Sequence, residues 1–486
     1  MLGEISAGIT GMNREYVNTA KEAGQKAQFS AQRTGARVLK RNGMSCDCAT
    51  GKFILRMSFC VPLINAVSVN AKAAVRAVRD ILDCVENTMK FLNFDKLGEY
   101  AKVHSRQREI RAYLKRGGLC AFVADGSILP RENGTELPKK DAVPFVSPDS
   151  LRVTVLFSGG TRISGMAIKQ GVTVITGGGY SGKSTLLDAL EMGIYNHIPG
   201  DGREYVITDS SALKIYAEDG RPVHSLDMSP FFKYLPGDAS VSDFSTFHAS
   251  GSVSQAANII EAVYGGSGVL LIDEDKSAVN FMICDPNMRK IVKHEPIIPF
   301  TDRICELYSE KKVSTILVIG GSSEFLLCAD TVILMDDYAA EDITPEIAEL
   351  FLPARNCCET AANFRNQRFL LPRKTNQPFL YLQTVETENE KKIILDDYSS
   401  DITHLTSLVS ADQMNSLSNV MEQLLTDMLA DSADILCKID AAIQTTFALG
   451  FRVTSMSPES GAGWYEEVRT LDAFCCINRM RGVSFR

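Results

Sequence analysis

Five short apolar runs rich in β-branched residues recur between residues 150 and 340, and each predicts a strand. Stretches with helical periodicity separate these runs. Strands that alternate with helices are typical of a parallel sheet that is covered by helices. The predicted strands are Val153 to Phe157, Val172 to Thr176, Val269 to Asp273, Ser314 to Ile319 and Thr331 to Met335. We therefore expect an α/β core over residues 149–345.

The pattern before this core differs and predicts an N-terminal α+β domain over residues 1–148. A partly alternating run, Lys52 to Leu63, predicts a strand that pairs with Arg37 to Leu39. Two stretches with helical periodicity follow it, Ala71 to Leu92 and Leu97 to Lys115. This domain therefore combines strands and helices without the regular alternation of the core.

The core is bounded by a predicted linker on one side and by a mainly helical domain on the other. Glu132 to Asp149 is rich in Pro, Lys and Gly, which is typical of a linker. Residues 346–486 include an amphipathic helix, whose apolar face consists of Val420, Met421, Leu424, Leu425, Met428 and Leu429. Such a face is more often part of a hydrophobic core than a partner surface, and dimerisation is the alternative.

The most specific motif is GGGYSGKST, which directly follows the predicted strand Val172 to Thr176. It matches the phosphate-binding (Walker A) pattern G-x-x-x-x-G-K-[ST], and a helical stretch begins after it. Its amides and the helix N-terminus favour an anion, Lys183 can reach the β- and γ-phosphates, and Ser184 can ligate Mg²⁺. The predicted loop residues are Gly177, Gly178, Gly179, Tyr180, Ser181, Gly182, Lys183, Ser184 and Thr185. A plain glycine-rich turn is the alternative, and the strand–loop–helix context argues against it.

Two carboxylates, Asp273 and Glu274, end the apolar run that begins at Val269. In phosphate-loop enzymes the first such carboxylate (Walker B) holds Mg²⁺ through water. The glutamate beside it can polarise the attacking water as general base. The alternative is a surface turn after a buried strand, which we favour less because the same chain carries the phosphate loop.

Two further segments flank these carboxylates. SGSVSQ, from Ser250 to Gln255, begins 23 residues before Asp273, and DKSAVN, from Asp275 to Asn280, follows Glu274. Together they resemble the ABC class of ATPases, which has an S-G-G-Q-like signature, then D-E, then a loop of the S-A-L-D type. In that class the signature serine and the helix N-terminus bind the γ-phosphate that the other subunit holds. The resemblance implies nucleotide contacts for Ser250, Gly251, Ser252 and Asn280. Without this context, the serine is more simply a helix N-cap.

From about Gly117 to Tyr338 the chain resembles a soluble family of predicted ATPases of the ABC class, whose kinetoplastid member belongs to a mitochondrial RNA-binding complex. The phrases that carry this resemblance are ADGSILPR (Ala124 to Arg131), TGGGYSGKSTLLDALEMGIYNHIPGDGRE (Thr176 to Glu204), ASGSVSQAANIIEA (Ala249 to Ala262), LLIDEDKSAVNFMICD (Leu270 to Asp285) and ADTVILMDDY (Ala329 to Tyr338). The final AFCCINRMRG (Ala473 to Gly482) is similar to the family's C-terminal helix. Met1 lies inside what resembles its N-terminal region, so we expect further residues upstream.

This resemblance implies a soluble ATPase that binds ATP and Mg²⁺ between two copies of the chain. One copy would supply Lys183, Ser184, Asp273 and Glu274, and the other would supply Ser250 and Gly251. Closure and hydrolysis would then drive a domain motion, and RNA is the partner that the resemblance implies.

Two departures from transporter-type ABC subunits predict slow hydrolysis that depends on Glu274. Gly320 stands where those subunits have a histidine that contacts the γ-phosphate, which is similar to the pattern of the soluble family. No glutamine lies between Lys183 and Gln255, so the glutamine that usually contacts Mg²⁺ and water is missing too. Asp227 is a candidate replacement, and a strand-end carboxylate in a turn explains it at least as well.

Two rival functions stay open. A nucleotide-gated scaffold would bind ATP and hardly turn it over, which the missing histidine and glutamine favour. A P-loop phosphotransferase would act on a small acceptor and would need neither Ser250–Gly251 nor Ser277–Ala278. Phosphate release without an added acceptor separates the ATPase from the phosphotransferase.

The composition is that of an ordinary globular protein with two or three domains. The chain has 486 residues, of which 45% are hydrophobic and 23% charged. It contains no run of about 18 apolar residues and no secretory signal at Met1, so we expect no membrane span. Its 13 cysteines then indicate a reducing compartment, either the cytoplasm or the mitochondrial matrix. They lack paired C-x-x-C spacing, so we expect no zinc.

The charge is unevenly distributed. Residues 1–150 carry 23 Lys and Arg against 15 Asp and Glu, whereas the remainder carries 28 against 44. Such asymmetry can mark nucleic-acid contact by the basic part, although the net charge of −8 argues against strong non-specific binding. A basic stripe at helical spacing consists of Arg106, Arg108, Arg111, Lys115 and Arg116. A solvated helix face is the more frequent interpretation of such a stripe.

Overall fold

The centre of the molecule is a six-stranded sheet in the order β14-β17-β18-β11-β19-β20. The computed structural model describes residues 28–47, 49–60, 63–64, 68–235, 239–351, 362, 364, 368–371, 382–386, 391–426, 434–448 and 464–485. All neighbours in the sheet are parallel except β19 and β20, which are antiparallel. The strands are β11 (Val172–Gly177), β14 (Leu213–Ile215), β17 (Val269–Asp273), β18 (Ser314–Val318), β19 (Thr331–Asp336) and β20 (Ala339–Asp342).

Four of the five predicted core strands form this sheet, which confirms the predicted α/β fold of the core. Every residue of β17 and β18 is buried, because helices cover both faces of a parallel sheet. This explains why these strands are continuous apolar runs rather than alternating ones. The helices of this part are α4 (Lys183–Met192), α5 (Gly251–Tyr264), α6 (Val279–Met282), α7 (Pro286–Ile291), α8 (Phe300–Lys311) and α9 (Thr344–Leu350).

The fifth predicted strand belongs to a second sheet. Val153 to Phe157 corresponds to β9, which pairs antiparallel with β10 in a four-stranded sheet of order β13-β8-β10-β9. A short connection joins β9 to β10, so they form a hairpin instead of a parallel crossover. The strands are β8 (Leu119–Ala124), β9 (Arg152–Leu156), β10 (Arg162–Lys169) and β13 (Val206–Thr208). Because β8 is part of this sheet, the core begins before the predicted boundary at residue 148.

The segment predicted as a linker, Glu132 to Asp149, packs on the core instead. Phe145 is buried in the hydrophobic cluster that also contains Leu186 of α4. The backbone N–H and the hydroxyl of Ser147 both donate to Asp125 Oδ1, at 2.7 Å each. The Pro- and Gly-rich segment is therefore an irregular connection that packs on the core. Its composition did not reveal this, because turn residues occur both in linkers and in packed irregular segments.

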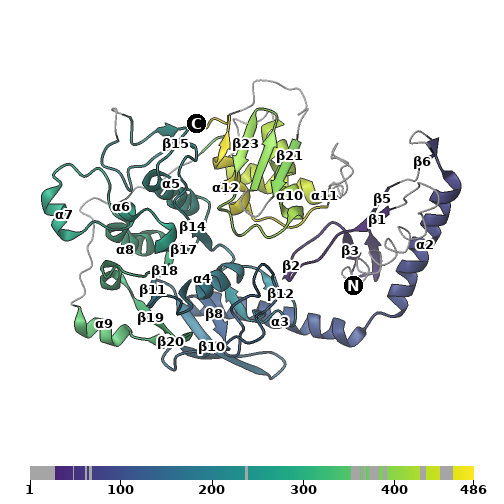
Figure 1. Cartoon of the computed structure of the whole chain (residues 1–486), viewed down its shortest axis with the longest axis horizontal. Coiled ribbons are helices and arrows are strands. Elements are labelled where there is room, and N and C mark those ends of the chain that lie inside the picture. The colour runs from purple at the N-terminus through teal and green to yellow at the C-terminus, as the bar shows by residue number, and fades with distance from the viewer. Residues whose placement is uncertain are drawn as a thin grey trace.

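The N-terminal part extends away from the core along two helices (Figure 1). α2 (Ala71–Lys90) and α3 (Phe94–Gly117) match the predicted helices, and each begins at an asparagine whose side chain accepts a backbone N–H of the first turn. The strands are β1 (Gln28–Ala31), β2 (Arg37–Val38), β3 (Met44–Asp47), β4 (Lys52–Leu55), β5 (Met57–Cys60), β6 (Leu63–Ile64) and β7 (Ser68–Val69).

The predicted strand pair in this part is wrong. The run from Lys52 to Leu63 is divided among strands that pair as β3–β4, β1–β5 and β6–β7. β2 instead pairs with β12 (Asn196–His197) of the core. The alternating pattern identified extended segments but contains no information about the partner of each strand.

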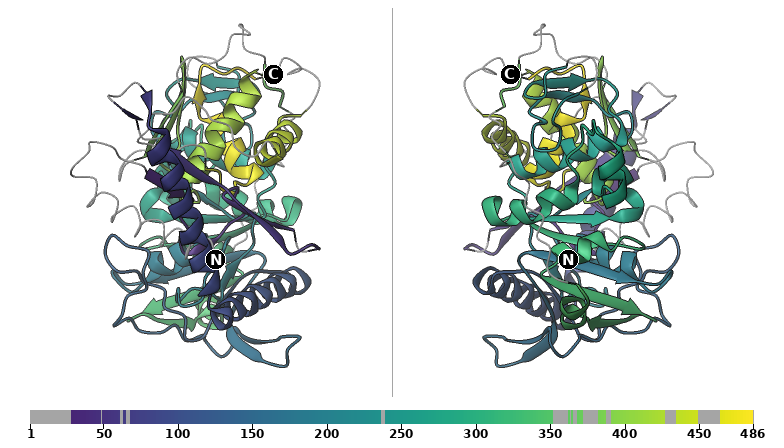
Figure 2. Two further views of the ribbon diagram at one scale, coloured as in Figure 1. Left: turned by 90° about the vertical axis from the view of Figure 1, so that its right-hand side faces the viewer. Right: turned by 90° about the vertical axis from the view of Figure 1, so that its left-hand side faces the viewer.

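The C-terminal part combines three helices with a four-stranded antiparallel sheet, β21-β22-β23-β24. Its elements are β21 (Leu382–Glu386), β22 (Lys391–Leu395), β23 (Tyr398–Asp401), β24 (Met480–Arg481), α10 (Ala411–Thr426), α11 (Ile435–Ala448) and α12 (Thr470–Asn478). The helices were expected and the sheet was not. Figure 2 shows this part at the top of the molecule and the sheet of β8 and β10 at the bottom.

The amphipathic face of α10 is core. Val420, Met421, Leu424 and Leu425 are buried in the same hydrophobic cluster as residues of β17 and α5, whereas Met428 and Leu429 lie outside the described residues. One continuous hydrophobic cluster thus joins the C-terminal part to the α/β core. It contains residues from both sides of the predicted domain boundary at residue 345.

Two further strands, β15 (Val223–Leu226) and β16 (Phe244–Thr246), form a hairpin next to the C-terminal sheet. His224 Nε2 lies 3.0 Å from the backbone oxygen of Met480, which joins β15 to β24. Within the described part of the chain, no helix is both long enough and apolar enough to cross a membrane.

Candidate active site

The predicted phosphate loop connects the end of β11 to the start of α4, as the motif requires. Gly177 has φ 143°, and a Cβ there would lie 2.1 Å from the backbone oxygen of Met335, so only glycine fits. Gly182 has φ 101° and is the N-cap of α4. Tyr180 has φ 59° and is 99% exposed on the loop. The loop therefore has the strand–turn–helix geometry that surrounds a phosphate with backbone N–H groups.

Lys183 folds back over this loop. Its Nζ donates to the backbone oxygens of Gly177, at 2.8 Å, and of Gly178, at 2.6 Å. The buried hydroxyl of Ser181 also donates to the oxygen of Gly178, at 2.9 Å. The ammonium group thus lies at the mouth of the loop, where it would exchange these carbonyl oxygens for phosphate oxygens. Ser184, exposed in the first turn of α4, supplies a hydroxyl beside it.

The sheet register brings the predicted carboxylates to the same edge. Asp273 pairs with Val318, and Val318 pairs with Ile175, two residues before the loop begins. Two strand spacings of about 4.8 Å each separate Asp273 from β11. The Asp273 carboxylate accepts the N–H of Asp275 at 3.2 Å and is 6% exposed. It therefore faces the C-terminal edge of the parallel strands, where the loop also lies.

Glu274 is held by two backbone N–H groups. Its Oε2 accepts the N–H of Gly320 at 2.6 Å and the N–H of Gly321 at 3.2 Å. These glycines follow β18, the strand between β17 and β11. At the position where transporter-type ABC subunits have a histidine, backbone N–H groups contact the predicted base. The sequence indicates the missing histidine but not this contact, because backbone donors have no sequence signature.

The predicted signature forms the N-terminus of α5. Ser250 is the exposed N-cap residue, and within the described structure its hydroxyl makes no cap hydrogen bond. A Cβ on Gly251 would lie 3.2 Å from Asp219 Oδ1, which is closer than ordinary contact. The first-turn N–H groups of a 14-residue helix are thus not satisfied by the side chain that usually caps them. The side-chain bond that the simple N-cap interpretation requires is therefore absent within the described structure.

A chain of hydrogen bonds connects this helix to Asp273. Gln255 is fully buried, its Nε2 donates to Ser277 Oγ at 3.0 Å, and its Oε1 accepts the N–H of Ala278 at 2.8 Å. Ser277 Oγ in turn donates to the backbone oxygen of Asp273 at 2.8 Å. The predicted signature, the S-A-containing loop and the two carboxylates therefore form one connected unit.

The structure does not bring all the predicted site residues together. Ser250 precedes α5, and Gly251 and Ser252 begin it. Within the described part of the chain, none of these three residues hydrogen-bonds the phosphate loop. Asn280 is exposed on α6. Asp227 accepts the N–H of Ser229 at 2.9 Å, which is the local turn contact of the alternative interpretation. One chain thus presents two separate groups of predicted nucleotide ligands.

A buried polar network beside α5 was not predicted from the sequence. Arg479 of the C-terminal part donates to Glu218, at 2.6 and 3.0 Å, and to Asn258 of α5, at 2.8 Å. Burial would raise the pKa of Glu218, but the charge and hydrogen bonds of Arg479 outweigh it and lower that pKa to about 2. Arg221 adds an ion pair to Glu261, also on α5. The signature helix is therefore tied to the C-terminal part by charged groups.

The basic stripe on α3 is only partly a surface feature. Arg111 donates to the backbone oxygens of Gly193, Ile194 and Thr208, and burial lowers its pKa to about 10. Arg106 contacts Thr161 and lies over the ring of Phe157. The remaining members, Arg108, Lys115 and Arg116, are exposed.

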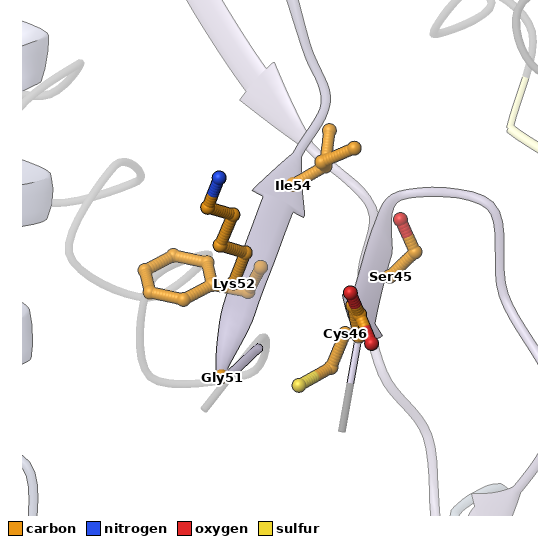
Figure 3. Close-up of a pocket in the computed structure, with 7 residues that line it drawn as sticks. Ser45, Cys46, Gly51, Lys52 and Ile54 are labelled. Carbon is orange, nitrogen blue, oxygen red and sulfur yellow. The ribbon is translucent and has the colours of Figure 1, made fainter. Parts of the chain in front are cut away.

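A hollow of about 670 Å³ lies elsewhere, on the hairpin of β3 and β4 (Figure 3). It is lined by Ser45, Cys46, Asp47, Gly51, Lys52, Phe53 and Ile54. No predicted site residue is among them, so this hollow is unrelated to the phosphate loop.

Fold and site together define a P-loop ATPase of the ABC type. Residues 93–368 match the model of the ABC_ATPase family, described as a P-loop domain. This match covers more than half of the chain, and the chain belongs to that family. This match confirms the predicted class, an ABC-type ATPase with a P-loop domain.

The chain is also similar to a curated relative, "Uncharacterized protein MJ1628" of Methanocaldococcus jannaschii. The two are 28% identical over 284 residues, which are 56% of this chain and 62% of the relative. The chain therefore spans less than two thirds of the length of that relative.

Among solved structures, cbiO1 of Clostridium perfringens, part of the ABC transporter complex cbiONQ, is 17% identical with a TM-score of 0.28, over 42% of this chain and 92% of cbiO1. The ADP conformation of MJ1267, an ATP-binding cassette of an ABC transporter, is 15% identical with a TM-score of 0.26, over 40% of this chain and 91% of MJ1267. These scores are too low to carry an argument about the site.

Proposed function

We propose that the protein binds ATP with Mg²⁺ between two copies of the chain and hydrolyses it with Glu274 as general base. The observation that carries this proposal is the uncapped N-terminus of α5 at Ser250, in a chain whose phosphate loop lies on another element. A nucleotide site that needs both the phosphate loop and the N-terminus of α5 can be completed by a second copy of the chain.

Lys183 and the loop form the first half of the site. The N–H groups of the loop and the N-terminus of α4 provide partial positive charge, and the ammonium group adds a full one. ATP would replace the carbonyl oxygens of Gly177 and Gly178 as the partners of Lys183. Binding therefore rearranges a lysine that is already at the correct place.

Mg²⁺ fits the oxygen donors that the chain offers. The exposed hydroxyl of Ser184 and the carboxylate of Asp273 lie at the same edge of the sheet, and oxygen ligands are those that Mg²⁺ prefers. When bound, the ion neutralises charge on the β- and γ-phosphates. Asp273 also receives the hydrogen-bond chain from Gln255, so its backbone position depends on α5.

The second copy would contribute Ser250, Gly251 and Ser252. A hydroxyl, a glycine N–H and a helix N-terminus all favour the same anion, here the γ-phosphate. ATP would thereby join the two copies, and hydrolysis would release them. Gln255 links the signature to Asp273 within each copy. A shift of the signature when one site closes would therefore also shift Asp273 in the other site.

The motion of closure and release would act on a macromolecule, and RNA is the candidate that the family resemblance implies. The exposed Arg108, Lys115 and Arg116 of α3 offer a basic surface for it. Crosslinking of the intact protein to total RNA tests this assignment. Recovery of RNA that is lost on Arg108→Glu with Lys115→Glu supports it, and recovery of none contradicts it.

The missing histidine at Gly320 and the missing glutamine between Lys183 and Gln255 favour one second candidate, a nucleotide-gated scaffold with little turnover. In that function ATP closes the two copies and stays bound. Phosphate release in a single turnover at excess enzyme distinguishes the two, because a scaffold releases almost none.

Glu274→Gln tests the proposed reaction. The amide keeps the shape of the side chain but cannot accept the proton of water, so hydrolysis should fall by about 100-fold or more while ATP binding persists. Sedimentation should then show a dimer with ATP and a monomer without it. An unchanged rate of phosphate release would exclude Glu274 as the base.

A further inference from the structure

We propose that Gly320 and Gly321 position Glu274 for catalysis through their backbone N–H groups. This inference rests on the proposed function, because it concerns the same hydrolysis. Both glycines are positioning residues, since they act through the carboxylate of Glu274.

The geometry of the contact is set by two neighbouring strands. Glu274 follows β17 and starts a short 3-10 turn that ends at Lys276. The N–H of Ile319 still bonds the backbone oxygen of Ile175 at 2.9 Å, so the chain leaves the sheet only at Gly320. Glu274 and Gly320 thus each lie one residue from the sheet hydrogen bonds, and Gly321 lies two residues from them.

Both hydrogen bonds fall on one oxygen of the carboxylate. Oε2 accepts from Gly320 at 2.6 Å and from Gly321 at 3.2 Å, while no described residue donates a hydrogen bond to Oε1. Two fixed donors restrict the rotation of a flexible side chain, and bonds to an ionised acceptor are stronger than neutral ones. Oε1 is then the atom that is available to water.

This restriction matters for the chemical step. The oxygen of water bonds to the γ-phosphorus, the bond from that phosphorus to the bridging β-phosphate oxygen breaks, and ADP leaves. Glu274 takes the proton that water loses. Because proton transfer needs hydrogen-bond distance to the attacking water, a carboxylate that rotates freely spends less time in the reactive position.

In the loop that follows β18, the groups that contact Glu274 are the backbone N–H groups of Gly320 and Gly321. The next side chain, Ser322, donates to Glu324 at 2.8 Å, so it is engaged elsewhere. A Cβ on Gly320 would lie 3.8 Å from Glu274 Oε2, an ordinary contact, and one on Gly321 would meet nothing within 4 Å. Neither glycine has positive φ. Alanine is therefore tolerated at both positions and keeps the N–H, whereas proline removes it.

These properties provide matched pairs of variants. Gly320→Pro removes the 2.6 Å bond and Gly320→Ala keeps it, and the same holds for the 3.2 Å bond with Gly321→Pro and Gly321→Ala. We expect Gly320→Pro to lower kcat by about 10- to 100-fold at an unchanged KM for ATP. Gly321→Pro should lower kcat less, and both alanine variants should match the wild type.

The test measures phosphate release, ATP affinity by calorimetry and thermal unfolding for the four variants, alone and with Glu274→Gln. A positioning role predicts that proline has no further effect once Glu274→Gln is present. Equal kcat for Gly320→Pro and Gly320→Ala would overturn the proposal. A kcat of Gly320→Pro above that of Gly320→Ala would overturn it too, because the contact would then hold Glu274 in an inactive position. If Gly320→Pro does not fold, the comparison of Gly321→Pro with Gly321→Ala decides by the same criteria. A wild type that binds ATP but releases no phosphate would instead contradict the proposed function.

Discussion

Arg479→Met should lower the free energy of unfolding by about 3 kcal/mol, because it leaves the carboxylate of Glu218 buried without its partner. Glu218 is 6% and Arg479 is 4% exposed, and two hydrogen bonds of 2.6 and 3.0 Å join their side chains. The pKa of Glu218 falls from 4.5 to about 2 in the folded protein. At about 1.4 kcal/mol for each pKa unit, this shift corresponds to about 3 kcal/mol.

The assay is urea unfolding followed by circular dichroism, with Lys90→Met as the control. Lys90 pairs with Glu86 at 2.8 Å, but both side chains are more than half exposed, so its loss should not change stability measurably. Methionine keeps the bulk of Arg479 and removes only charge and donors. A loss of stability for Arg479→Met no larger than that of the control would refute the reasoning.

The pH dependence provides a second check with a definite sign. Because folding depresses the pKa of Glu218, its contribution is complete above 4.5 and disappears as the pH falls through about 2. The difference in stability between the wild type and Arg479→Met should therefore shrink as the pH falls from about 4.5 to about 2. A difference that grows on acidification would show that another group is responsible.

Two further predictions concern ATP. Lys183→Ala should abolish ATP binding in calorimetry, because it removes the cation at the mouth of the loop, and unchanged affinity would contradict the phosphate-loop assignment. Gln255→Leu should leave ATP affinity intact but lower kcat, because Ser277 and Ala278 lose the bonds through which α5 reaches Asp273. Normal phosphate release by this variant would show that the connection is only structural.

The sequence predicted the parts of the molecule that depend on residues close together in the chain. The phosphate loop needs Gly177, Gly182 and Lys183 at fixed spacing, and β17 needs a buried apolar run, so both could be identified from the sequence. β9 was assigned to the wrong sheet, because an apolar run shows that a strand forms and not which strand it pairs with. The same reason explains the error in pairing Lys52 to Leu63 with Arg37 to Leu39.

Contacts between residues far apart in the chain could not be predicted from the sequence. Arg479 and Glu218 lie 261 residues apart, and neither differs in sequence from an ordinary surface charge. The N–H groups of Gly320 and Gly321 belong to every non-proline residue, so a motif can report only that a histidine is absent. For Asp227 the sequence left a ligand and a turn carboxylate open, and its hydrogen bond with the N–H of Ser229 is the contact expected of the turn.

The central claim is that each ATP site is built from two copies of the chain. Ser250→Arg should bind ATP as a monomer but fail to dimerise, because its side chain would occupy the γ-phosphate position of the partner. Lys183→Ala should fail for the complementary reason, since it lacks the cation and keeps the signature.

Mixing these two variants tests the claim most directly. A heterodimer contains one site with an intact loop from the Ser250→Arg chain and an intact signature from the Lys183→Ala chain. Sedimentation and phosphate release with ATP should therefore show dimers and activity in the mixture, at most half of the wild-type activity, and neither in the separate variants. If Ser250→Arg alone dimerises and hydrolyses ATP normally, or if the mixture stays inactive while the wild type hydrolyses ATP, the two-copy site is contradicted.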